Sequence, residues 1–393
     1  MASDSKQLTT DARDNAGPTG FPWPPRAARG LPRLRHTNFH TEWRTEMALL
    51  NSTAKRIVTA VALLLAFALP FLIGGDLLRT TILAAIAGIG AIALSLIAGV
   101  AGQLSLGHAA FLGLGAYSAA FITSNLELHF FVALPVAAAV AGLAGLLLAP
   151  MALRLRGLYL AVVTLAFVLV MQHVYRNATP ITGGVGGTRI ESPTIAGVSL
   201  TRGGELAGID FPGPTLYYFL VLLLLLATIV GVKNLLRSRM GRDFAAVRDH
   251  DIAAGVVGVR VFAATTRAFV ISSAIAGVAG ALMGGLLRHT SYGQWGMMLS
   301  VDYLAMVILG GLGTVAGPVL GAVFVTFMPE VLDQIAPMVP FISEEVGQGL
   351  TPERTSRLLY GVLLATVMVF EPLGLYGIWL RIRIYFMTWP FSR

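Results

Sequence analysis

The sequence IALSLIAGVAGQLSLGHAAFLGLGAYSAA occupies residues 92–120 and decides the fold. An apolar run reaches Gly102, is interrupted by the polar and small residues of 102–108, and then resumes. Inside a lipid bilayer, backbone N–H and C=O groups must find their partners within the protein. The interruption therefore predicts either a membrane boundary or an irregular segment in a protein-lined cavity.

Small residues after this break recur every four positions, which places them on narrow stripes of a helix. Such stripes allow another helix to approach closely. Two similar seams occur in the second half, and we expect both to pack against helices rather than lipid. They are Ser273-Gly277-Ala281-Gly285 and Gly313-Gly317-Gly321.

The composition indicates an all-α polytopic membrane protein. Of 393 residues, 55% are hydrophobic and only 12% are charged, and the mean hydropathy is +0.75, whereas globular domains carry about 25% charged residues. Several apolar runs are close to the roughly 20 residues that span a bilayer. We predict about ten transmembrane helices, or eight if the 301–328 pair is re-entrant. The candidates are 57–75, 81–102, 105–124, 130–153, 158–175, 214–232, 268–287, a pair within 301–328, and 354–371.

The short loops predict the orientation, because cytoplasmic loops are enriched in Lys and Arg. The 154–157 turn, the 233–267 loop with its seven Lys and Arg residues, and the tail 381–393 are expected inside. The 125–129 turn and the 176–213 loop are expected outside, as is the acidic 329–353 loop. Ten spans with both termini in the cytoplasm satisfy these assignments.

Residues 1–55 are polar and basic, and we predict a largely disordered cytoplasmic arm or a short interfacial helix before the transmembrane domain at 56–380. The net charge of +8 does not favour nucleic-acid binding, because the basic residues flank apolar spans. The chain has no cysteine, which excludes disulfides and thiolate metal sites. A metal site at His36 and His40 is disfavoured against solvated side chains.

The sequence offers no enzyme constellation. Its three lysines, Lys6, Lys55 and Lys233, all lie outside a GxxxxGK[ST] context, so the chain has no Walker A phosphate-binding loop. No HExxH or GxSxG motif with a fitting context is present. We therefore expect no cofactor on this chain and no catalysis by it.

The 233–267 loop is too polar to span a membrane, and its composition is helical. Alone, this pattern favours a solvated connector. His108, directly after the break, is an ionisable residue within the membrane region and hence a functional candidate. A structural hydrogen bond to a nearby carbonyl and direct substrate contact both stay open.

Four segments resemble the integral-membrane permeases of branched-chain amino-acid ABC importers. They are GQLSLGHAAFLGLGAY at 102–117, RGLY at 156–159, TGG at 182–184 and MVILGGLGTVAGPVLGA at 306–322. The resemblance covers about 57–380 and implies an ABC importer permease fold in the bacterial inner membrane. It also implies a second, LivH-type permease, two ATP-binding-cassette ATPases that use the ATP, and an extracytoplasmic substrate-binding protein.

The same resemblance implies roles for particular residues. The 233–267 loop would dock on an ATPase, although Asp251 replaces the common Glu. The translocation pathway would include Gln103, Ser105, Gly107, His108 and Tyr117. The coupling loop would use Arg248, Asp251, Ala253, Ala254 and Gly258, and the extracytoplasmic loop Thr182, Gly183 and Gly184. A urea or short-amide importer of the same architecture, and a stand-alone secondary transporter, are the alternatives.

Overall fold

The computed structural model describes residues 53–155, 157–195, 198–206 and 209–335, with scattered residues between 358 and 381. The chain divides into Met1–Thr53 and Ala54–Arg393, and nearly all described residues belong to the second unit. The predicted arm, most of the predicted span 354–371 and nearly all of the tail lie outside the described residues.

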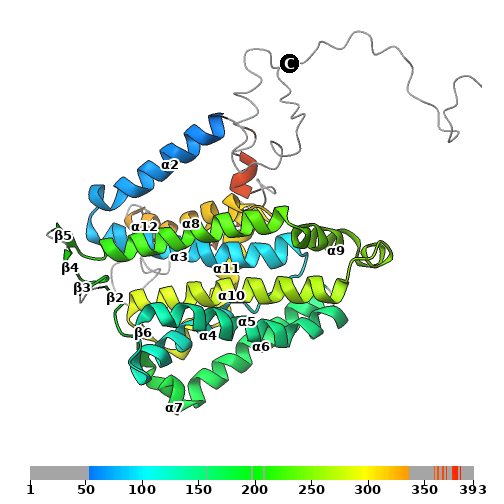
Figure 1. Cartoon of the computed structure of the whole chain (residues 1–393), viewed down its shortest axis with the longest axis horizontal. Coiled ribbons are helices and arrows are strands. Elements are labelled where there is room, and N and C mark those ends of the chain that lie inside the picture. Colours follow the sequence, from blue (N-terminus) through cyan, green and yellow to red (C-terminus); the bar gives the residue numbers. More distant parts are fainter. Residues whose placement is uncertain are drawn as a thin grey trace, which may run out of the picture. The chain divides into compact units, whose positions relative to one another are not determined.

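The described part is mainly helical (Figure 1). Its α-helices are α2 (Thr53–Leu72), α3 (Gly75–Ser95), α4 (His108–Ala120), α5 (Phe130–Arg154), α6 (Leu158–Asn177), α7 (Thr179–Thr182), α8 (Thr215–Arg237), α9 (Arg239–Val256), α10 (Val261–Leu287), α11 (Met297–Gly310) and α12 (Ala316–Ile335). The π-helical turns η1 (Leu96–Val100) and η2 (Phe121–Asn125) continue α3 and α4.

Short strands and turns complete the described part. Strands β1 (Thr188–Arg189) and β6 (His289–Thr290) pair antiparallel. A second antiparallel sheet has the order β2-β3-β4-β5, formed by Thr194–Ile195, Val198–Ser199, Gly203–Leu206 and Ile209–Pro212. The 3₁₀ turns are η3 (Gly184–Gly186) and η4 (Tyr292–Trp295).

Five described helices are long and apolar enough to cross a membrane: α3 with η1, α5, α6, α8 and α10. All five coincide with predicted spans, so the structure agrees with a polytopic membrane protein. Shorter apolar helices lie at Thr59–Leu72, Met297–Gly310 and Ala316–Leu332. The span predicted at 105–124 corresponds to α4 and η2, which begin only at His108 and are not among these five helices. The total of ten spans stays a prediction.

Helix α3 lies in the core. Its most apolar window is 89% buried, against 28% for α6, because α8, α10, α11 and α12 all pack on it. The chain leaves α3 through η1 directly into the break. Within the break, Ser105 and Gly107 are buried, whereas Gly102 and Leu104 are exposed.

Small residues allow α10 to pack tightly on α4 and α5. A Cβ atom at Gly277 would overlap the Ala137 carbonyl of α5, and one at Gly280 would overlap the Leu112 carbonyl of α4. Gly285 lies against the Phe130 ring in the same way. The predicted seam of small residues is thus confirmed as a helix-packing surface.

The pair of spans predicted within 301–328 is the hairpin of α11 and α12. A Cβ at Gly317 would meet the Gly310 carbonyl, and one at Gly321 would meet the Met306 carbonyl. Gly313 lies before α12 and packs against Gly99 instead, so the second predicted seam is confirmed between these two helices only at Gly317 and Gly321. It brings their backbones close together, as small residues do in membrane helix pairs.

The two ends of the helices differ in Figure 1: the β-strands lie at one end, and α9 lies at the other. At the strand end, β1 and β6 tie the segments after α6 and α10 together. The Ser124 hydroxyl there donates to the Arg189 carbonyl at 2.6 Å. Helix α9 connects α8 to α10 at the opposite end.

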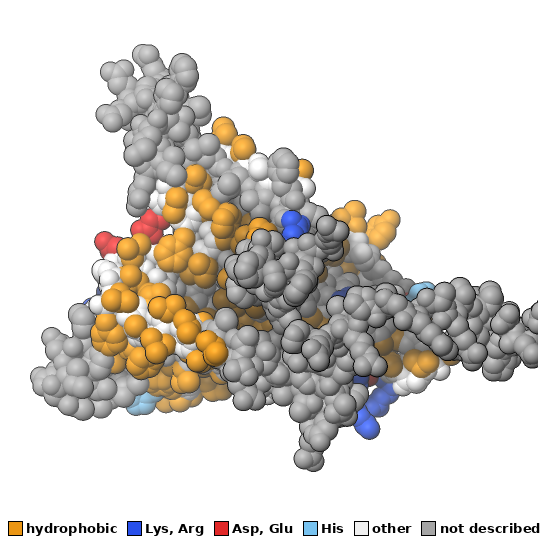
Figure 2. Space-filling view, turned by 90° about the horizontal axis from the view of Figure 1, so that it is seen from above, with side chains coloured by type: hydrophobic (Ala, Val, Ile, Leu, Met, Phe, Trp, Pro, Cys, Tyr) orange, Lys and Arg blue, Asp and Glu red, His pale blue; other side chains and the backbone are white. Residues whose placement is uncertain are grey.

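Much of the described surface is apolar. Large hydrophobic side chains are exposed on α2, including Leu64 and Phe67, and on α5, including Leu147. Figure 2 shows hydrophobic side chains gathered over a broad area of one face, with few charged ones among them. A surface of this kind suits lipid or other membrane helices.

Candidate functional site

The break follows a change in the last turns of α3. Residues Leu96–Val100 form a π-helical turn, a rare conformation that is frequently found at functional sites. Residues 101–107 then run without regular helix or strand. Gly102 takes a φ of +70°, a left-handed conformation that glycine adopts readily.

Side chains from distant helices satisfy the backbone of the break. The amide of Leu106 donates to Thr164 Oγ1 of α6 at 2.9 Å. The amide of Ala109, at the start of α4, donates to Ser300 Oγ of α11 at 3.0 Å. Within the break, the Gly107 amide donates to Ser105 Oγ at 3.3 Å. Since an unsatisfied amide in the bilayer costs several kcal/mol, these hydroxyl groups make the irregular segment possible.

His108 is buried at the start of α4, with 2% of its surface exposed. Its imidazole donates a hydrogen bond to the backbone of Gly90 in α3, and its ring centroid lies 4.9 Å from that of Tyr303. Nε2 has no hydrogen-bond partner among the described residues. The residue thus combines a structural bond with an unused acceptor.

A second break joins α11 to α12 and lies against the first. A Cβ at Gly99 would overlap the Gly313 nitrogen, so the two backbones touch. The Ser95 hydroxyl also donates to the Thr314 carbonyl at 3.1 Å. The two interruptions, distant in sequence, form one structural unit.

Helix α9 lies beside η1. His250 has non-helical angles (φ −163°, ψ 102°), so α9 is kinked there. Beyond the kink, Ile252 and Val256 are 67% and 84% exposed. Ala253 and Gly258 are also exposed, whereas Ala254 is buried.

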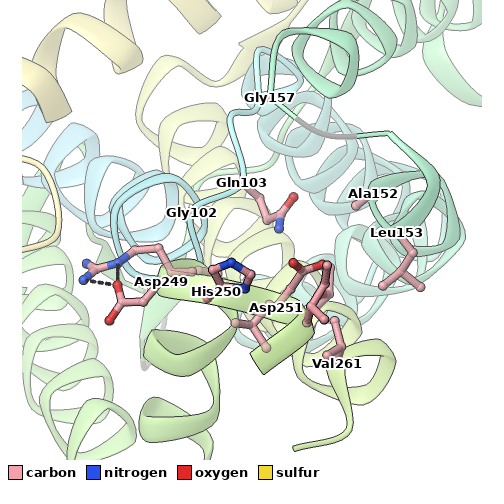
Figure 3. Close-up of a pocket in the computed structure, with 14 residues that line it drawn as sticks. Gly102, Gln103, Ala152, Leu153, Gly157, Asp249, His250, Asp251 and Val261 are labelled. Atoms are coloured by element: carbon pink, nitrogen blue, oxygen red, sulfur yellow. Dashed lines mark hydrogen bonds and ion pairs between the residues drawn. The ribbon is translucent and has the colours of Figure 1, made fainter. Parts of the chain in front are cut away.

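A cavity of about 500 Å³ lies between the break, α9 and the ends of α5 and α10. Gln103 projects into it from the break, facing the side formed by His250 and Asp251 (Figure 3). Arg248 and Thr265 contribute further polar groups. The lining mixes both charge signs and an amide, which suits a hydrated passage for a small polar solute.

The structure brings only some of the predicted pathway residues to this cavity. Gln103 lines it, whereas Ser105, Gly107 and His108 are buried in the helix packing. Tyr117 is buried further along α4 and stacks on Tyr175, with ring centroids 4.6 Å apart. The five residues therefore do not form one surface.

The predicted extracytoplasmic residues lie at the strand end, in the turn after α6. The Thr182 hydroxyl donates to the Ala178 carbonyl at 2.9 Å, and the Gly184 amide donates to Thr182 Oγ1 at 3.2 Å. Gly183 lies between them in the same turn. These contacts give the TGG sequence a local role in ending the helix.

Comparison with known families gives a match over residues 77–368 to the branched-chain amino acid transport system permease component. The chain is 32% identical over 345 residues to the high-affinity branched-chain amino acid transport system permease protein LivM of Escherichia coli strain K12, covering 84% of this chain and 76% of that relative. The chain belongs to this permease family.

Other relatives of this permease give a consistent picture. LivM of Salmonella typhimurium strain LT2 has the same identity and coverage. The autoinducer 2 import system permease protein LsrC of Enterobacter sp. strain 638 is 34% identical over 114 residues, which are 28% of this chain and 33% of the relative. No solved structure matches the chain.

Sequence reasoning missed several residues that shape this permease. Thr164 and Ser300 satisfy the first break, and Thr314 shapes the second. Each is a hydroxyl residue within or beside an apolar helix, which is the available signal. Because Ser and Thr hydroxyls also bond to their own helix, that signal does not identify the partner.

Proposed function

We propose that this protein is the permease subunit of an ATP-binding-cassette importer that moves branched-chain amino acids across the bacterial inner membrane. The family match over most of the transmembrane domain supports this function. The observation that carries the mechanism is the position of α9 beside the first break. A segment that docks on an ATPase would there act directly on the pathway.

The exposed part of α9 supports the docking role. Ile252, Val256 and Val257 are large apolar residues with exposed side chains, on a helix whose neighbourhood is basic. The seven Lys and Arg residues of 233–267 favour a cytoplasmic position. A protein groove that accepts Asp251, Ala253 and Gly258 would cover this apolar surface.

The cavity supports a translocation role for the break. With α9 cytoplasmic, the cavity beside Gln103 would be the inner mouth of the pathway, and both termini would also lie inside. His108, with its free Nε2, would contact the amino acid once the helices around it separate. ATP binding at the ATPases would supply that separation, because a ligand shifts an equilibrium only through its different affinities for the two states.

The proposed partners would supply what this chain lacks in its sequence, a Walker A loop for binding ATP. ATP would be bound by two ATPase subunits and not by this chain, which would carry no cofactor. A second, LivH-type permease would complete the pathway, and a substrate-binding protein would deliver the amino acid at the strand end, near Thr182. The named relatives make a urea importer or a stand-alone transporter the weaker alternative.

Reconstitution tests this function. The complex, purified from native membranes by a tag on this chain, is placed in vesicles with labelled leucine, the co-purified binding protein and ATP. We expect leucine uptake that needs ATP and exceeds urea uptake. Uptake by the chain alone, or uptake of urea in preference to leucine, would contradict the proposal.

The docking role has its own test. Ala253→Glu adds a charge to the exposed surface of α9, and we expect it to lower the amount of ATPase that co-purifies. Asn177→Glu, at an exposed position at the strand end and outside the 233–267 loop, is the control. Equal recovery of the ATPase with both variants and the natural chain would exclude docking at Ala253.

A further inference from the structure

Arg248 of α9 contacts the end of α3 and not only its own helix. Its Nη1 donates to the Gly99 carbonyl at 3.2 Å. Nε and Nη2 donate to Asp249 Oδ1 at 3.0 and 2.9 Å. Asp249 therefore holds the guanidinium in an orientation that directs its remaining donor at the break, although 46% of the Arg248 side chain is exposed.

The Arg248 side chain also fills a space left by a glycine of the break. A Cβ at Gly102 would lie 2.6 Å from Arg248 Cγ and 3.2 Å from its Cβ. The aliphatic part of the side chain thus lies against 102, while the guanidinium binds 99. Arg248 thus holds α9 against the end of α3 at two points, Gly99 in η1 and Gly102 in the break.

Gly99 connects this contact to the second break. It lies in the π-helical turn at the end of α3, where helix carbonyls lack the partners of a continuing helix. A guanidinium at such an end is favoured by the hydrogen bond and by the helix dipole. The other side of Gly99 touches Gly313. The turn that contains Gly99 therefore contacts α9 through Arg248 and the second break through Gly313.

We propose that Arg248 is a positioning residue that transmits the motion of α9 to both breaks. When a docked ATPase moves α9, Arg248 moves the π-helical turn, and the Gly99–Gly313 contact carries the displacement to the α11–α12 hairpin. This inference rests on the importer function proposed above. It assigns Arg248 an internal contact and leaves ATPase docking to the exposed apolar residues.

The test compares variants in the reconstituted complex. Arg248→Met keeps the aliphatic contact with Gly102 but removes the bond to Gly99, and Arg248→Lys restores one donor. Arg242→Met is the control, because Arg242 is exposed on the same helix and its Nη1 binds the nearby Arg237 carbonyl. The quantities measured are leucine uptake, ATP hydrolysis and ATPase recovery.

We expect Arg248→Met to lower leucine uptake per ATP hydrolysed by about tenfold, the loss expected for a hydrogen bond from a charged group. ATP hydrolysis and ATPase recovery should stay close to those of the natural complex, because Arg248 contacts the end of α3 and not the exposed apolar residues of α9. Arg248→Lys should restore part of the ratio, and Arg242→Met should not change it. An unchanged ratio in Arg248→Met, or a parallel loss of ATPase recovery, would overturn the proposal.

A labelling measurement separates transmission from simple stabilisation. The chain has no cysteine, so Leu104→Cys in the exposed part of the break provides a single thiol on this subunit. We expect ATP to change its labelling rate in the otherwise natural complex but not in one that also carries Arg248→Met. The same ATP response in both would overturn transmission through Arg248, and a natural complex without ATP-driven uptake would instead refute the importer function.

Discussion

The two breaks satisfy the hydrogen-bonding groups of their irregular backbone in different ways. The first, at 101–107, is long. Its Leu106 amide binds a hydroxyl group of α6, and the Ala109 amide just after it binds one of α11. The second, at 311–315, is short and supplies its own partner. Thr314 Oγ1 donates to the Gly311 carbonyl at 2.8 Å and accepts from the Gly317 amide at 3.1 Å.

The first segment relies on hydroxyl groups of neighbouring helices for two amides, whereas the second forms two of its hydrogen bonds with the side chain of its own threonine. Displacing α6 or α11 would remove the partners of the Leu106 and Ala109 amides, whereas the two Thr314 side-chain bonds would move with the hairpin. Helix packing therefore controls the conformation of the first break. We expect its variants to change transport, and those of the second to change mainly stability.

The largest effect should come from adding side-chain atoms where the Gly99 and Gly313 backbones touch. Gly99→Val places side-chain atoms against the Gly313 backbone, and overpacking costs about 1–3 kcal/mol even where side chains move aside. We expect loss of folded protein, measured as monodisperse yield in detergent. Gly231→Ala is the control, because nothing lies within 4 Å of its new Cβ. A normal yield of Gly99→Val would refute the close contact.

The second effect concerns the buried imidazole. His108→Leu removes both the bond to Gly90 and the free Nε2, and we expect leucine uptake to fall by about tenfold, as for a lost hydrogen bond to a polar substrate. ATPase recovery should be unchanged, and the exposed His173→Leu serves as control. Loss of assembly in His108→Leu would instead favour a structural role.

A smaller effect should follow from removing a partner of the first break. Ser300→Ala leaves the buried Ala109 amide unpaired, which costs about 1–3 kcal/mol. We expect reduced uptake and a lower thermal midpoint. Ser118→Ala is the matched control, because that hydroxyl bonds only to Leu114 of its own helix at 2.6 Å. Equal behaviour of the two variants would contradict the importance of the distant contact.

The smallest effect on transport should come from the second break. Thr314→Val removes two local hydrogen bonds, each worth about 0.5–1.5 kcal/mol net. We expect a lower thermal midpoint but an unchanged ratio of leucine uptake to ATP hydrolysis. A ratio reduced as much as by Ser300→Ala would remove the distinction between the breaks.

Much of the fold could be predicted, because apolar length and small-residue spacing are local properties. The spans α3, α5, α6, α8 and α10, and the seams on α10 and α12, follow from them. The candidate site was harder to predict from the sequence. Tyr117 belongs to the same conspicuous sequence as Gln103, yet only Gln103 reaches the cavity, since Tyr117 lies further along α4 and packs against Tyr175.

The sequence by itself determined a polytopic helical membrane protein, its family, and the interruption of the chain after α3. These depend on composition, periodicity and motifs that are contiguous in the chain. Only the tertiary structure decided what satisfies that interruption: Thr164, Ser300 and Arg248 come from three separate elements. A hydroxyl or guanidinium carries no sequence signal for a partner 58 to 191 residues away, because packing alone brings the two together.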